Sequence, residues 1–117
     1  MLTINIKLDA CYIRREGKKM KVVVGEVKAR KGVIRTKIAC MNKEWRIEFT
    51  GDFMVYPEEI VFQLEEELGG IPMTLEYYIL KIQTILSKAE LFGCTVDDFV
   101  ASFQKAFSEA SRVCLEY

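Results

Sequence analysis

Hydrophobic and polar residues alternate through the first half of the chain, with the two-residue period of a β-strand. Trp45, Ile47 and Phe49 are separated by polar residues, so one side of this stretch is apolar. The alternation predicts a strand over Glu44–Thr50. Gly51 and the residue after it break the pattern, because both are common in turns.

Further strands are expected upstream. Met20–Ala29 and Val33–Met41 are rich in β-branched residues, and the turn Arg30–Gly32 lies between them. A tight turn at Asn42–Lys43 leads into the next strand, and Thr3–Leu8 forms a further short one. Short connections favour an antiparallel meander of three to four strands, in which one face of the sheet is apolar and buried and the other is basic.

The second half of the chain has the spacing of amphipathic helices. A first helix begins at Pro57 and ends before Gly69-Gly70, and several glutamates lie on its solvent-exposed face. A second helix begins after Thr74 and is stopped by Gly93. The third begins at Thr95, in a near capping box with Asp98. Strands followed by helices indicate one α+β domain over residues 1–117, with three helices packed on one face of the sheet.

Composition supports a compact domain with a sizeable core. The chain has 117 residues, of which 50% are hydrophobic. No apolar run approaches the ~20 residues that a membrane span needs. The first residues alternate polar with apolar and lack the apolar block of a signal peptide, so we expect a cytoplasmic protein without membrane contact.

Charge is divided unevenly along the chain although the formal net charge is zero. Residues 1–46 hold 13 Lys and Arg against 4 Asp and Glu, whereas residues 47–117 hold 4 against 13. A basic sheet face is one way to bind nucleic acid, which leaves a nucleic-acid-binding module as one hypothesis. The basic residues are scattered along strands and no RNA-recognition signature is present, so we expect no nucleic-acid partner.

The residues of this chain do not form a recognisable catalytic set. The chain has no histidine, which removes Ser–His and Cys–His nucleophile pairs, and it has no phosphate-binding glycine loop. Cys11, Cys40, Cys94 and Cys114 are too dispersed for a zinc motif, and free, mostly buried thiols are predicted. A sulfur acceptor or iron–sulfur scaffold that uses Cys40 or Cys94 remains an alternative. No catalytic or metal-binding residue is assigned.

The connection between the last strand and the first helix is the best candidate for a binding surface. Phe53, Met54, Val55 and Tyr56 are four consecutive apolar residues, and such a run cannot all face one core. Either some of these side chains contact a partner, or the loop is buried against the helices. Asp52 has a local explanation as well, a hydrogen bond that closes the turn.

At this point the sequence resembles a known family. The segment Phe49–Ile60, with the sequence Phe-Thr-Gly-Asp-Phe-Met-Val-Tyr-Pro-Glu-Glu-Ile, is similar to the C-terminal accessory domain of lipoate–protein ligases. In archaea and some bacteria this domain is a separate small subunit. Gly32–Ile34 resembles the family's turn between strands, and Gly93–Val100 resembles the start of its last helix. The resemblance extends from about Lys18 to Phe107, and residues 1–17 match nothing recognisable.

The resemblance implies a division of labour between two subunits. The large catalytic subunit would hold ATP, Mg and lipoate, form lipoyl-adenylate and modify lipoyl-acceptor domains, while this chain docks on it as a non-catalytic subunit of a heterodimer. The implied fold is SufE/NifU-like, the fold of sulfur-transfer and iron–sulfur scaffold proteins. Gly51, Asp52, Phe53 and Tyr56 would lie on the loop that faces the partner, where Gly51 permits the turn and Asp52 makes it rigid.

Overall fold

The computed structural model describes residues 21–41 and 44–114. The strand expected over Thr3–Leu8, the turn at Asn42–Lys43 and the whole of residues 1–17 lie outside these ranges. The assignment of residues 1–117 to a single domain stays a prediction.

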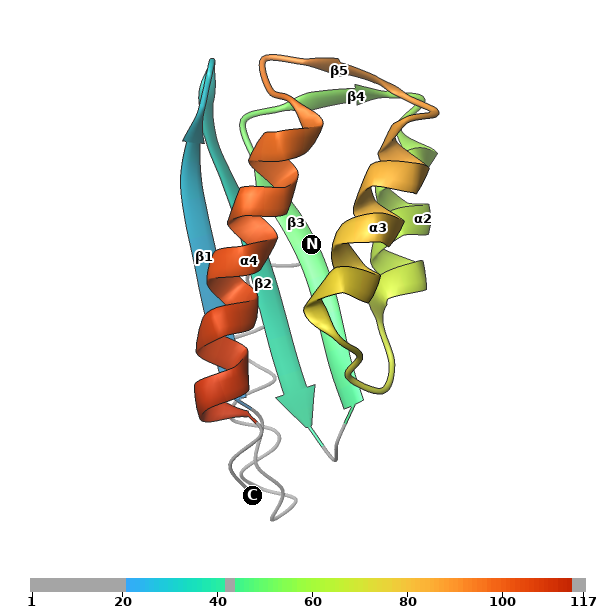
Figure 1. Cartoon of the computed structure of the whole chain (residues 1–117). Coiled ribbons are helices and arrows are strands. Elements are labelled where there is room, and N and C mark those ends of the chain that lie inside the picture. Colours follow the sequence, from blue (N-terminus) through green and yellow to red (C-terminus); the bar gives the residue numbers. More distant parts are fainter. Residues whose placement is uncertain (1–20, 42–43, 115–117) are drawn as a thin grey trace, which may run out of the picture.

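Three long antiparallel strands form the main sheet (Figure 1). They are β1 (Lys21–Ala29), β2 (Gly32–Met41) and β3 (Glu44–Gly51), in the order β1-β2-β3. β2 is central: its Ile38 lies opposite Val23 of β1 and Ile47 of β3. The predicted meander is therefore confirmed.

Three helices of the described residues cover one face of this sheet (Figure 1). They are α2 (Glu59–Leu68), α3 (Leu75–Leu86) and α4 (Val96–Val113). α4 packs on β1 and β2, α2 packs beside β3, and α3 contacts both other helices. This arrangement confirms the predicted α+β fold, in which strands come first and helices follow.

The helix starts follow from local hydrogen bonds. The Tyr77 N–H donates to the Thr74 hydroxyl, which caps α3, and Thr95 and Asp98 form a reciprocal capping box at the start of α4. The prediction that Pro57 opens the first helix is wrong by two residues. Ile60 N–H bonds back to the Pro57 carbonyl, and α2 itself begins at Glu59.

The prediction that the second helix continues to Gly93 is also wrong. α3 ends at Leu86, and residues Glu90–Phe92 form the short strand β5. This strand pairs antiparallel with β4 (Met54–Tyr56), which lies inside the connection expected between the last strand and the first helix. The protein therefore has a second sheet, of two strands, at one end of the main one (Figure 1).

Aromatic side chains fill the space between the helices and β3. Trp45 stacks on Tyr78, with ring centroids 6.1 Å apart, and meets Phe107 edge-on at 5.7 Å. Phe49 meets Phe99 edge-on at 5.4 Å. Offset and edge-to-face contacts of this kind add to the hydrophobic contribution of each ring.

α4 approaches β1 most closely at Gly25. A Cβ at this position would lie 2.4 Å from the Ala106 nitrogen and 2.5 Å from the Ser102 carbonyl oxygen. The Ser102 hydroxyl donates to the Gly25 carbonyl at 2.9 Å, so its only proton is used and the buried Thr36 hydroxyl donates to Ser102 at 2.8 Å. Glycine is required here because the helix rests directly on the strand backbone.

The outer edge of β3 is closed by α2 and the residues after it. Trp45 and Gly70 exchange two backbone hydrogen bonds, at 2.7 and 2.8 Å. Further along the edge, the Phe49 N–H donates to the Glu65 carboxylate at 2.8 Å. Partial burial raises the pKa of Glu65; the Phe49 hydrogen bond lowers this pKa and the charge of Glu48 raises it. The carboxylate thus occupies a position that another strand would otherwise take.

The sheet face away from the helices is not basic, contrary to the prediction. Two ion pairs bridge neighbouring strands: Arg35 with Glu26 at 3.1 Å, and Lys37 with Glu48 at 3.4 Å. On the described strands this face carries both signs of charge: Lys28, Arg35, Lys37, Arg46, Glu26, Glu44 and Glu48. The basic character deduced from residues 1–46 is largely neutralised across the strands, which argues against a nucleic-acid surface here.

Candidate protein-binding surface

The two-stranded sheet lies across the end of the molecule where β3 finishes and α4 starts (Figure 1). In its register Met54 lies opposite Phe92, Val55 opposite Leu91, and Tyr56 opposite Glu90. Residues that face each other in an antiparallel pair point to the same side of the sheet. One side therefore carries Val55 and Leu91, and the other carries the remaining four.

The inner side belongs to the core. Val55 is 4% exposed, and Leu91 packs against the buried cluster. Phe53, directly before β4, also packs there, with its ring 4.9 Å from that of Phe99. These contacts fix the short sheet on the helices.

The outer side is apolar and open to water. Met54 is 64% exposed, Tyr56 67% and Phe92 50%. We call these three side chains the end patch. Met54 and Phe92 are direct cross-strand neighbours, and Tyr56 follows Met54 on the same face. Three large apolar side chains grouped in this way are a typical protein-contact surface, whereas single exposed hydrophobic residues are not.

Asp52 holds the strand that leads into this patch. Its N–H donates to the Val33 carbonyl at 2.8 Å, and its carboxylate accepts the Val33 N–H at 3.3 Å. Gly51 has φ +141°, and a Cβ there would lie 2.1 Å from the Val33 oxygen. Only glycine fits this close crossing of β2, and the turn is clamped from both sides.

A second backbone contact ties the other strand of the patch to the main sheet. The Lys31 N–H, in the turn between β1 and β2, donates to the Gly93 carbonyl at 3.2 Å. Gly93 follows β5 directly and has φ +80°, where a side chain would be strained. Both strands of the small sheet are thus anchored to β2 or to the turn before it, so the end patch is presented on a fixed backbone.

The four residues predicted to face a partner do not share one environment. Gly51 and Asp52 are exposed but make the clamp on β2, Phe53 packs against Phe99, and Tyr56 projects outward. That all four face a partner stays a prediction. Sequence reasoning missed Phe92, since it was assigned to the tail of a helix. Its position directly before Gly93 could have indicated a separate short element, because too few apolar residues precede this glycine for another helical turn.

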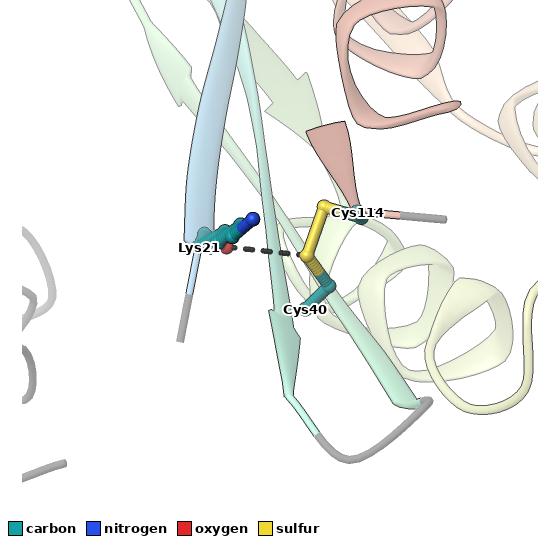
Figure 2. Close-up of a disulfide and its surroundings, with 3 residues drawn as sticks. All are labelled: Lys21, Cys40 and Cys114. Carbon is teal, nitrogen blue, oxygen red and sulfur yellow. Dashed lines mark hydrogen bonds between the residues drawn. A yellow bond between two sulfur atoms is a disulfide. The ribbon is translucent and has the colours of Figure 1, made fainter. Parts of the chain in front are cut away.

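The prediction of free thiols is wrong for two cysteines. Cys40 at the end of β2 and Cys114 just after α4 form a disulfide, with Cα atoms 6.1 Å apart (Figure 2). The Cys40 sulfur also lies 3.5 Å from the Lys21 carbonyl oxygen. A disulfide sulfur carries no proton, so this approach is a close contact and not a true hydrogen bond.

Cys94 is buried and lies at the opposite end of α4 from Cys114. The 18 residues of the helix separate the two positions by roughly 27 Å. Burial raises the pKa of the Cys94 thiol, and the charge of Asp98 raises it further. Cys40 and Cys94 are therefore far apart, one oxidised and one buried as a protonated thiol, which argues against a shared sulfur or cluster site.

The described residues form neither a metal-ligand cluster nor a membrane-spanning helix. In residues 21–41 and 44–114, no three or more side chains of His, Cys, Asp or Glu come together as metal ligands would. Over the same residues, every helix is too short or too polar to cross a bilayer. The cytoplasmic location and the absence of a bound cofactor stay predictions.

Comparison with known proteins gives one informative match. No protein-family model matches the chain, and no curated protein sequence does. A solved structure does: a chain from the structural analysis of an archaeal lipoylation system, a bi-partite lipoate protein ligase and its E2 lipoyl domain from Thermoplasma acidophilum. The two chains are 25% identical with a TM-score of 0.60, over 71% of this chain and 94% of that chain. This similarity confirms the resemblance drawn from the sequence.

Proposed function

We propose that this chain is a non-catalytic accessory subunit of an ATP-dependent lipoate–protein ligase, and that it forms a heterodimer with the large catalytic subunit. The observation that carries the proposal is the match to a component of a bipartite lipoylation system, over 94% of that component's length. Because the match covers nearly all of that component, it supports a role of the same kind for this chain.

The proposed division of labour is the one that the resemblance in sequence implies. In this proposal ATP, Mg and lipoate are held by the large subunit. The accessory subunit would dock against that site, exclude water from the labile acyl-adenylate, and support its transfer to lipoyl-acceptor domains.

The direct test is lipoylation of an acceptor domain by the cognate large subunit, with and without this chain. The expected result is that lipoyl-adenylate and lipoylated acceptor form efficiently only when both chains are present. The isolated chain should form neither. Equal activity of the large subunit alone, at saturating ATP and lipoate, would overturn the proposal.

The choice of variants for this test follows from the structure. Phe53→Ala removes a ring from the core beside Phe99, and Asp52→Ala releases the clamp on Val33. Both substitutions change folding stability as well as any contact with a partner. Tyr56→Ala removes an exposed side chain, so loss of activity in this variant reports on binding.

The sulfur-acceptor or iron–sulfur alternative gains nothing from the structure. It requires accessible thiols at Cys40 or Cys94, and one is oxidised while the other is buried. Anaerobic reconstitution with iron and sulfide is expected to leave the protein without a stable chromophore.

A further inference from the structure

We propose that the end patch, formed by Met54, Tyr56 and Phe92, is the centre of the surface that binds the large catalytic subunit, through an apolar contact surrounded by basic groups of that subunit. This inference rests on the proposed function and adds the surface and the chemistry of the contact.

The size of the patch fits the centre of an interface. An aromatic side chain buries about 150–250 Å² when fully covered, so the two partly exposed rings together with Met54 expose roughly 300–400 Å². A stable interface buries about 800 Å² on each partner, with an apolar centre and a polar rim. The patch supplies the apolar centre, and the residues that flank it supply the rim.

The flanking charges are mainly acidic. Within three residues of β4 and β5 lie the carboxylates of Asp52, Glu58, Glu59 and Glu90, against the ammonium group of Lys88. Lys31 adds one cation through its backbone contact with Gly93. Glu90 is the cross-strand neighbour of Tyr56 and shares its face. A surface with basic groups around an apolar centre would complement this arrangement.

The same charges argue against a second copy of this chain as the occupant. A two-fold symmetric contact brings each patch onto itself, so Glu58, Glu59 and Glu90 of both copies would meet at one rim. Like charges across an interface oppose association. The occupant is therefore a different protein.

The backbone is suited to this role. The strands that carry the patch are tied to the main sheet by the Asp52–Val33 hydrogen bonds and by the Lys31–Gly93 hydrogen bond. A surface held in one conformation loses little conformational entropy when it binds. Tyr56 is of a type that often dominates binding energy, and Phe and Met are enriched at the centres of interfaces.

The experiment measures binding of the cognate large subunit to wild type and to three variants by calorimetry or surface plasmon resonance. The double variant Met54→Ala/Phe92→Ala is expected to raise the dissociation constant about 100-fold, and Tyr56→Ala is expected to raise it about tenfold. Ile71→Ala is the matched control, because this side chain is 72% exposed but lies in the connection after α2, at the far end of that helix. It should change affinity by less than about twofold.

The rim is tested separately. Glu90→Lys is expected to slow association and to reduce its dependence on salt, because an attractive pair becomes repulsive. Thermal unfolding of each variant alone serves as the folding control, and surface changes should shift it little.

The possible outcomes separate the two proposals. If wild type binds and activates the large subunit but the patch variants do so equally well, the patch is not the interface and the accessory role stands. If wild type neither binds nor activates it, both proposals fail. Self-association of wild type that is abolished by the double variant, with no effect on large-subunit binding, would assign the patch to a homodimer and overturn the inference.

Discussion

The two sheets of this protein use hydrophobic residues in opposite ways. On the central strand of the main sheet, every inward residue from Ile34 to Cys40 is buried, and the outer edge of β3 is closed by Gly70 and Glu65. In the two-stranded sheet, two of the three residues of β4 point outward and are apolar. The main sheet uses its hydrophobic side chains to fold, whereas the small sheet leaves most of its own uncovered. This difference is the basis on which we propose a binding surface at the small sheet.

The largest effect is expected from the link between the main sheet and α4. Reducing the Cys40–Cys114 disulfide, or replacing both cysteines by serine, opens a covalent loop that spans 74 residues. Chain-entropy estimates for a loop of this length give a loss of about 4 kcal/mol in the free energy of unfolding. Urea unfolding with and without reductant measures it. The serine variant should be insensitive to reductant, and an equal midpoint for wild type in both conditions would contradict the prediction.

A slightly smaller loss is expected at the contact between α4 and β1. In Gly25→Ala the new methyl group collides with the backbone at Ser102 and Ala106, so the helix must move away from the sheet. Overpacking of this kind costs about 3 kcal/mol. Gly69→Ala is the matched control, because the nearest atom to its Cβ would be the Trp45 oxygen at an ordinary 3.5 Å. Urea midpoints that fall equally in both variants would show that close approach is not the cause.

Within the small sheet, adjacent residues should behave differently. Val55→Ala leaves a cavity in the core and is expected to cost about 2 kcal/mol. Met54→Ala should change stability by less than about 0.5 kcal/mol, because its side chain is already in water. Thermal unfolding of the two variants decides the matter. Equal destabilisation would mean that the small sheet has no distinct outer face.

The smallest effect concerns the closed edge of β3. The pKa of Glu65 in the folded protein is raised above the ordinary glutamate value of 4.5, chiefly by burial. Its contribution to stability is therefore fully present below about pH 4.5 and is lost as the pH rises through the raised value. Glu65→Gln keeps an oxygen acceptor for Phe49 without the charge. Relative to wild type, this variant should therefore gain stability as the pH rises above about 4.5.

Unfolding curves at several pH values, with Glu66→Gln as an exposed control for the loss of one charge, test this expectation. A constant difference between Glu65→Gln and wild type at every pH would contradict it.

The main sheet and the helix faces were predictable from the sequence because local periodicity is strong there. Trp45, Ile47 and Phe49 alternate over a full strand, and Thr95 with Asp98 forms a cap whose partners are three residues apart. The small sheet was not predictable. Strands of three residues are too short to establish a period of two, and Leu91 lies near helical spacing from the residues before it.

Two other features depend on contacts that no local pattern reveals. Cys40 and Cys114 are 74 residues apart, and their pairing requires the packing of α4 on β2. The excess of Lys and Arg in residues 1–46 also led to the wrong prediction of a basic sheet face. A count along the chain does not show which carboxylates lie beside these cations on neighbouring strands. The Lys37–Glu48 ion pair is an example.

The packing of α4 on β1 has a consequence for how the chain folds during synthesis. The hydrogen bond from Ser102 to Gly25 joins residues 77 positions apart, so the apolar face of β1 lacks its cover until α4 has left the ribosome. Contacts at such long range form slowly, and a nascent chain that exposes strands in the meantime is prone to aggregate. The cover of β1 is therefore complete only after synthesis has passed the end of α4.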